Sequence, residues 1–155
     1  FTFYSTAGNQ LRELAFQIMQ KQLKSIGIEL QNKFRAGVFS VLPTGNWDLF
    51  LFTWIGSPDP SGSVEIHKCK GDQNYNAYCN NKVTKLLDTS QNTVDPQKRI
   101  DLMNEADRLM AKDLPTLPLF ARPGFLISKT SVSNVLKNPT SEGPTWNSEL
   151  WTVAR

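Results

Sequence analysis

One stretch, from Asp48 to Pro60, restricts the fold of this chain more than any other. Its first half is apolar from Leu49 to Ile55 apart from Thr53, and its second half is a run of turn-forming residues. A short apolar run that ends in turn residues is typical of a buried strand followed by a loop, so we expect a strand from Trp47 to Ile55. In open α/β sheets the ligand lies beyond the carboxyl ends of such strands. Trp54 and the loop behind it are therefore candidate site residues.

The composition is that of a soluble globular domain. The chain has 155 residues, of which 39% are hydrophobic and 20% charged, a balance that predicts a packed core rather than disorder. No apolar run approaches the roughly 20 residues of a membrane-spanning helix. Phe1 to Tyr4 is aromatic and strand-like, without a signal-peptide pattern, so we expect a fragment of a longer protein.

The charge pattern argues against a nucleic-acid partner. Seventeen basic and fourteen acidic residues leave a net charge of +3, and both signs are spread along the chain. A nucleic-acid-binding surface would concentrate Lys and Arg on one face or segment. The nearest approach to a basic cluster, Lys68 to Lys70, is short and includes a cysteine.

The first third of the chain alternates between strand and helix patterns. Phe1 to Tyr4 predicts a strand, and Leu11 to Ile26 carries apolar residues at helical spacing before Gly27. Apolar residues at even spacing from Ile28 to Phe34 predict a second strand. A strand–helix–strand unit normally forms a parallel crossover. The sequence therefore predicts an α/β fold.

The remaining chain predicts two helices among loops and short strands. Asn80 or Asn81 can cap a short helix, and Asp95-Pro96 is a strong start signal for a longer one. The inward side chains of that longer helix are expected to be Ile100, Met103, Ala106, Leu109 and Met110. We also expect a surface loop over 58–71, a turn over 122–124 and a strand over 125–128. The Pro-punctuated extended segment over 114–121 is expected to be an edge strand or a strand entry.

Two cysteines, Cys69 and Cys79, lie in one polar loop. Neighbouring loop cysteines favour a disulfide and an oxidising compartment. Two free thiols are an alternative. A metal site that recruits His67 and Asp72 is another, but the spacing lacks the patterns of zinc sites.

No catalytic constellation can be named. His67 is the single histidine and has no evident partner, so a solvated loop residue is its ordinary interpretation. Asp48 and Asp59 stand at opposite ends of the predicted strand, too far apart to act on one bond. Phosphate-binding, dinucleotide-binding and nucleophile-elbow motifs are absent from the sequence. We therefore predict neither an enzyme nor a cofactor.

Several residues instead suggest ligand binding, each beside a structural alternative. Trp54 is either a stacking platform or a core aromatic residue. Asp59, between two prolines, is either a turn former or a ligand contact. The loop from Ser5 to Asn9 offers backbone N–H groups to a carboxylate, or simply caps the helix. The predicted ligand contacts are Ser5, Thr6, Trp54, Gly56, Ser57 and Asp59.

A series of motifs along the whole chain resembles family 5 of the extracellular solute-binding proteins, the peptide-, oligopeptide- and nickel-type receptors of ABC importers. No single motif is diagnostic, but their order and spacing are fairly specific. The closing Asn-Pro-Thr-x-x-Gly-Pro-Thr-Trp-Asn is similar to the branch found in Gram-positive lipoproteins. The motifs are Arg12 and Ala15 before Ile26-Gly27-Ile28, Trp47-Asp48, Trp54 to Pro60, Asn74-Tyr75 with Tyr78, Asp95 with Arg99, Pro115 to Leu119, Asn138-Pro139, and Trp146-Asn147 with Trp151.

The resemblance implies one lobe of a periplasmic-binding-protein type II-like fold, with a mixed sheet flanked by helices. Residues 1–155 would be the C-terminal lobe of a two-lobed receptor that closes on its ligand like a hinge, and 123–155 a tail crossing back towards the other lobe. The implied ligand is a peptide or similar solute, and the implied partners are ABC permease subunits. The receptor would be extracytoplasmic, in the periplasm or on the cell surface, attached to a membrane only through a lipid anchor outside this chain.

The resemblance also bears on individual residues. Peptide binders of this family often place an acid three residues after the Trp, where it holds the ligand's amino group. Here Ser57 has that position and Asp59 is the acid, which leaves open which of the two meets the ligand. Some relatives carry a disulfide in the loop that matches Cys69 and Cys79. The alternative functions are an extracytoplasmic hydrolase domain and a protein-interaction domain.

Overall fold

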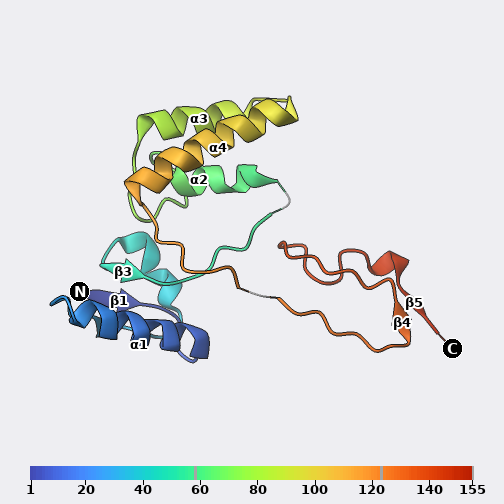
Figure 1. Cartoon of the computed structure of the whole chain (residues 1–155), viewed down its shortest axis with the longest axis horizontal. Helices are drawn as coiled ribbons and strands as arrows, with labels where there is room; N and C mark the ends of the chain where they lie inside the picture. The colour runs from blue at the N-terminus through green and yellow to red at the C-terminus, as the bar shows by residue number, and fades with distance from the viewer. Residues whose placement is uncertain (58, 123, 155) are drawn as a thin grey trace. The chain divides into compact units, whose positions relative to one another are not determined.

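The computed structural model describes residues 1–57, 59–122 and 124–154. Pro58 and Pro123, which belong to the predicted loops, lie outside the described residues. The chain forms two compact units, Phe1–Trp54 and Ile55–Arg155, called unit 1 and unit 2 below (Figure 1). No described helix combines the length and apolar character that crossing a membrane requires.

Unit 1 is built on a parallel sheet in the order β2-β1-β3. Phe3 of the central strand is opposite Asn32 on one side and Leu49 on the other. The parallel pairing of the first two strands confirms the predicted crossover. The strands are β1 (Thr2–Tyr4), β2 (Gln31–Asn32) and β3 (Leu49–Phe50).

Helix α1 (Gln10–Lys24) covers one face of this sheet (Figure 1). Asn9 is its N-cap, because the side chain accepts a 3.2 Å hydrogen bond from the backbone N–H of Arg12. Phe16 of the helix meets Phe3 of β1 edge to face at 5.1 Å. These two rings and Leu30 form a buried cluster in the core of unit 1.

The opposite face of the sheet is aromatic. Phe50 is stacked on Tyr4 at 6.3 Å and meets Phe52 edge to face at 5.7 Å. Phe39, from the short 3₁₀ helix η1 (Val38–Ser40), lies 6.0 Å from both phenylalanine rings. Leu49 and Leu51 point the other way, into the core. The period of two along β3 thus separates an aliphatic face from an aromatic one.

The predicted strand from Trp47 to Ile55 is wrong at both ends. Ladder pairing is confined to Leu49–Phe50, extended by one hydrogen bond from Leu51 N to Tyr4 O. Trp54 and Ile55 are 43% and 71% exposed, so they do not continue a buried strand. The neighbouring β1 ends at Tyr4, and a strand without a partner has no ladder to extend.

Unit 2 is organised by two packed helices, α3 and α4. Asn80 caps α3 by accepting from Lys82 N and Val83 N, and Asp95 caps α4 by accepting from Lys98 N at 2.8 Å. Both helix predictions are confirmed, including Pro96 in the first turn. The helices are α3 (Asn81–Gln91) and α4 (Pro96–Asp113), and the core between them and α2 (Val64–His67) contains Val64, Val83, Leu87 and Ala106.

Two expectations for unit 2 need correction. The predicted loop over 58–71 instead contains the 3₁₀ helix η3 (Pro60–Ser63) followed by α2, and Val64 is fully buried. Ile100, expected to point inward, is 49% exposed, whereas Ala106 is fully buried. Only the central and C-terminal turns of α4 contribute to the core.

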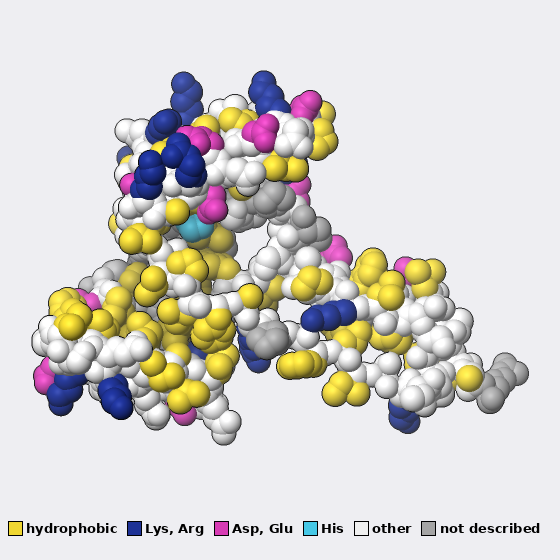
Figure 2. All heavy atoms as spheres, in the orientation of Figure 1, with side chains coloured by type: hydrophobic (Ala, Val, Ile, Leu, Met, Phe, Trp, Pro, Cys, Tyr) yellow, Lys and Arg dark blue, Asp and Glu magenta, His cyan; other side chains and the backbone are white. Residues whose placement is uncertain are grey.

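Figure 2 shows charged side chains gathered over α3 and α4 and hydrophobic ones over the visible face of unit 1.

The chain after α4 is mostly extended. No strand occurs in the described parts of 114–121 and 125–128, which corrects both predictions, and Phe125 is 87% exposed. The strands in this region are β4 (Val132–Ser133) and β5 (Thr152–Val153), which pair antiparallel. Buried Asn147 donates to the carbonyl of Asn134 at 2.7 Å, and accepts from Nε1 of Trp151 at 3.0 Å. The tail thus has polar anchors where the sequence shows no periodicity.

Candidate ligand-binding site

The segments that follow the three strands of unit 1 meet at one edge of the sheet. Buried Ser5, directly after β1, donates its hydroxyl to the carbonyl of Leu51 after β3 at 2.7 Å. Thr6 forms a parallel bridge with Arg35, which follows β2. This is the carboxyl edge of a parallel sheet, where α/β proteins place their ligands.

The turn before α1 is stabilised by its own side chains. Gly8 donates its backbone N–H to Glu13 at 3.0 Å, and Asn9 caps the helix as described. The hydroxyl of Thr6 accepts a 2.7 Å hydrogen bond from the guanidinium of Arg12. Helix capping, rather than a bound carboxylate, therefore accounts for the backbone N–H groups of Gly8 and Arg12. Arg12 adds a positive charge beside Thr6, which would suit an anionic or carbonyl group.

Trp54 is the exposed end of an aromatic row. Its ring meets Phe52 edge to face at 5.0 Å, and Phe52 in turn meets Phe50. The side chain is 43% exposed, so one part of the ring is supported by the protein while another faces outward. A large ring held in this way provides apolar contact area at little cost in side-chain entropy.

In unit 2, Gly56, Ser57 and Asp59 belong to one hydrogen-bonded segment. The carbonyl of Gly56 accepts a 3.0 Å hydrogen bond from the backbone N–H of Ser141 in the tail. The hydroxyl of Ser57 donates to the backbone carbonyl of Asp59. A Cβ added at Gly62 would lie 3.1 Å from the Ser57 hydroxyl, so the segment is closely packed here.

Asp59 is held by two donors. Its Oδ1 accepts a 2.7 Å hydrogen bond from Ser61 N, which makes Asp59 the N-cap of η3. The same oxygen accepts from Nη2 of Arg99 on α4 in an ion pair. The hydrogen bond from Arg99, followed by those from Ser61, lowers the pKa of Asp59 to about 2. The turn-forming interpretation of Asp59 thus describes its contacts in unit 2.

The same electrostatics bear on the hydrolase alternative. A carboxylate with a pKa near 2 is a weak general base at neutral pH, because catalytic groups work best when their pKa is near the working pH. His67 ends α2, and burial lowers its pKa although the Asp107 charge opposes the shift. Among the described residues, no group of three or more His, Cys, Asp or Glu side chains could hold a metal ion.

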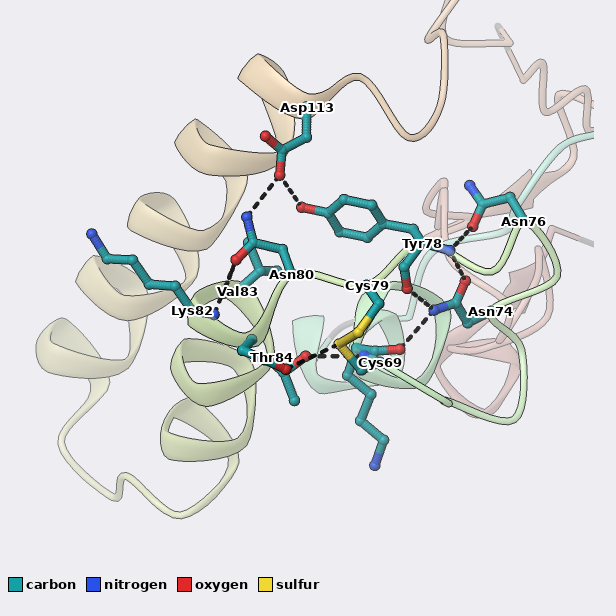
Figure 3. The surroundings of a disulfide bond; sticks show 12 residues. Cys69, Asn74, Asn76, Tyr78, Cys79, Asn80, Lys82, Val83, Thr84 and Asp113 are labelled. Atoms are coloured by element: carbon teal, nitrogen blue, oxygen red, sulfur yellow. Dashed lines mark hydrogen bonds between the residues drawn. A yellow bond between two sulfur atoms is a disulfide. The ribbon is translucent and has the colours of Figure 1, made fainter.

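The predicted disulfide is present and lies between α2 and α3 (Figure 3). Cys69 and Cys79 are bonded, which contradicts the free-thiol and metal alternatives for this pair. Asn74 supports the loop from inside by donating to the carbonyls of Lys68 and Tyr78 at 2.7 and 2.6 Å. The loop is thus closed covalently and braced by a side-chain amide.

Sequence reasoning missed the role of Arg99. The residue appeared in the family resemblance, next to the helix start at Asp95, but without a function. Its partner Asp59 is 40 positions away, and no local pattern connects a loop acid with an arginine in a helix. Of the six predicted contacts, Ser5, Thr6 and Trp54 lie in unit 1, and Gly56, Ser57 and Asp59 lie in unit 2.

Comparison with known proteins identifies relatives of this arrangement, although no family model matches the chain. An uncharacterized lipoprotein of Mycobacterium tuberculosis is 31% identical over 93 residues, covering 60% of this chain and 16% of the relative. The oligopeptide-binding protein OppA of that species is 30% identical over 122 residues, covering 76% of this chain and 21% of the relative. The chain therefore spans about a fifth or less of the length of these relatives.

Solved structures share the fold. An oligopeptide-binding protein from Thermus thermophilus, complexed with a pentapeptide, has a TM-score of 0.79 at 22% identity, covering 98% of this chain and 29% of that protein. The periplasmic EDTA-binding protein EppA has a TM-score of 0.86 at 21% identity, covering 99% of this chain and 29% of that protein. These likenesses confirm the α/β lobe of the periplasmic-binding-protein type II class.

The relatives also indicate where the protein works. One relative is a lipoprotein and one structural neighbour, EppA, is periplasmic, which agrees with an extracytoplasmic location for this chain. Its disulfide agrees with an oxidising, extracytoplasmic compartment. The chain is thus similar in sequence to part of the oligopeptide-binding proteins and shares their fold, in agreement with the resemblance to family 5 of the extracellular solute-binding proteins.

Proposed function

We propose that this chain is the C-terminal, ligand-closing lobe of a peptide receptor that serves an ABC importer. The homology to oligopeptide-binding proteins supports a peptide as the ligand. The proposed contacts are the six predicted residues Ser5, Thr6, Trp54, Gly56, Ser57 and Asp59. The receptor binds and releases its solute without a chemical step.

The observation that carries this proposal is the position of Trp54. It follows β3 at the carboxyl edge of a parallel sheet, and its ring is supported by Phe52 yet 43% exposed. An aromatic ring in that position suits the apolar side chains and flat amide groups of a peptide. The hydroxyl and guanidinium of Thr6 and Arg12 supply polar groups at the same edge.

For the rest of the receptor we propose what the family resemblance implies. Residues 1–155 form one lobe, and residues 123–155 cross back towards the other lobe. Ligand binding closes the lobes like a hinge, and the closed form engages the ABC permease subunits. A lipid anchor outside this chain attaches the receptor to the membrane.

A thermal-shift experiment on the full-length product of the gene tests the proposal. Ligand at 100 times its Kd stabilises the folded state by about 2.7 kcal/mol, so a mixture of short peptides is expected to raise Tm. Trp54→Ala is expected to abolish this gain. Trp146→Ala is the matched control, because Trp146 is 45% exposed and its Nε1 hydrogen-bonds Leu136 O within the tail.

The outcomes separate the alternatives. Loss of the gain in Trp54→Ala alone supports the proposed site. An undiminished gain in Trp54→Ala would remove Trp54 from the site. Absence of any gain, combined with hydrolysis of the peptides, would favour the hydrolase alternative. Mass spectrometry of co-purified solutes then reports the ligand directly.

A further inference from the structure

The carboxylate of Asp59 already has a positively charged partner within the chain. Arg99, in the first turns of α4, donates from Nη2 to Oδ1 of Asp59. The side chains are 28% exposed for Arg99 and 54% exposed for Asp59, so the pair is partly shielded from solvent. A guanidinium stays protonated at every physiological pH, so this partner charge is permanent.

The ion pair also fixes the segment that carries it. Oδ1 of Asp59 accepts hydrogen bonds from Ser61 N and from Arg99. The backbone carbonyl of Asp59 accepts a third from the Ser57 hydroxyl. Gly62 packs against that hydroxyl. Ser57, Asp59 and η3 thus form one hydrogen-bonded segment, which the ion pair joins to α4. The carboxylate of Asp59 cannot turn away from Arg99 without breaking these hydrogen bonds.

The net charge of this hydrogen-bonded segment, with Arg99 included, decides which ligand groups it attracts. An isolated Asp59 would present one negative charge and favour a ligand's ammonium group. With Arg99 in contact, the net charge of the pair is zero, and repulsion by Arg99 offsets much of the attraction that Asp59 exerts on an approaching ammonium. A ligand ammonium would also lose hydration there without full compensation.

We propose that Arg99 is a specificity-determining residue, which neutralises Asp59 so that Ser57, Asp59 and η3 accept an uncharged part of a peptide rather than a free amino terminus. This inference rests on the proposed peptide-receptor function. Asp59 then positions the segment, and any contact that it makes with the ligand is made by a carboxylate whose charge is already neutralised.

The test compares two pools of random pentapeptides, identical except that one has free and the other acetylated amino termini. Binding to the full-length product of the gene is measured by calorimetry. The wild type is expected to bind the acetylated pool at least as tightly as the free pool. Arg99→Gln exposes the Asp59 charge and is expected to raise affinity for the free pool about ten-fold, as for a partly screened charge. Arg99→Lys keeps the charge and is expected to restore the wild-type order.

A second measurement follows the pair itself. NMR titration of Asp59 in the 155-residue chain is expected to show a pKa of about 2, rising towards the ordinary aspartate value in Arg99→Gln. A wild type that prefers the free pool ten-fold would overturn the inference and leave the receptor function standing. An unchanged Asp59 pKa in Arg99→Gln would also overturn it. If neither pool binds, the receptor function fails and this inference falls with it, whatever the titration shows.

Discussion

The phenolic hydroxyl of Tyr78 donates a 2.6 Å hydrogen bond to Oδ2 of Asp113, the last residue of α4. Asn80, the cap of α3, donates to the same oxygen at 2.8 Å. One carboxylate therefore connects the end of the disulfide loop, the start of α3 and the end of α4 (Figure 3). Both donors lower the pKa of Asp113, Tyr78 more than Asn80.

Tyr78→Phe is expected to lower the free energy of unfolding by about 1 kcal/mol, the usual net value of one hydrogen bond. Urea denaturation measures the change. Tyr4→Phe is the control, since the structure shows a ring contact with Phe50 but no hydroxyl hydrogen bond for Tyr4 within the described residues. Equal destabilisation by both substitutions would contradict the assigned role of the Tyr78 hydroxyl.

The hydrogen bond between Tyr78 and Asp113 also predicts that the stability of the fold depends on pH in the alkaline range. Desolvation, and then the hydrogen bond to Asp113, raise the pKa of Tyr78 to about 12, above the value of about 10 in an unfolded chain. A raised pKa contributes stability that is complete below about pH 10 and is lost as the pH rises through about 12. The stability difference between wild type and Tyr78→Phe is therefore expected to shrink over this interval.

The disulfide gives a prediction of its own. Cys69 and Cys79 are 10 positions apart, so opening the bond is expected to cost about 3 kcal/mol in chain entropy. Denaturation with and without a reducing agent measures this cost. The double substitution Cys69→Ser and Cys79→Ser is the control, because a reducing agent should no longer affect it. Non-reducing peptide mapping should find the two cysteines joined, and two alkylatable thiols would contradict the bond.

Another prediction concerns acid sensitivity in unit 1. Oδ2 of Asp48 accepts from the backbone N–H and the hydroxyl of Thr2 at 2.6 and 2.8 Å. The backbone hydrogen bond, followed by the hydroxyl, lowers the pKa of Asp48. A lowered pKa contributes stability that is present above the unfolded-state pKa and lost as the pH falls through the folded-state pKa. Asp48→Asn is therefore expected to destabilise the chain at pH 7 and much less at pH 2.

Chemical denaturation at the two pH values checks this expectation. Glu149→Gln is the control, since it removes an exposed carboxylate in the tail. A destabilisation by Asp48→Asn that is equally large at pH 2 and pH 7 would show that the charge of Asp48 is not responsible.

Helices could be predicted from the sequence because their signals are local. Asn9, Asn80 and Asp95 each accept backbone N–H groups two or three positions along the chain, so a cap and the helix it starts are neighbours in sequence. The strand–helix–strand motif and the disulfide could also be predicted, since each depends on residues that are close together in the sequence. The fold class and the candidate ligand loops follow from these elements.

Contacts between distant segments explain what could not be predicted. Ile100 has the correct helical spacing for a core residue but is 49% exposed, because burial depends on where α3 ends alongside α4. Val64 lies in a stretch without periodicity, yet it is fully buried among residues of α3 and α4. The length of β3 depends likewise on where its partner β1 ends.

The sequence by itself determined an α/β lobe with capped helices and a disulfide loop, because hydrophobic period, caps and turn residues act over a few positions. The tertiary structure alone decided the charge of the candidate site. In the sequence Asp59 is only an acidic residue between two prolines. Folding brings Arg99, 40 residues later, to its carboxylate, and the two form an ion pair without net charge. Local patterns carry no information about such a long-range electrostatic contact.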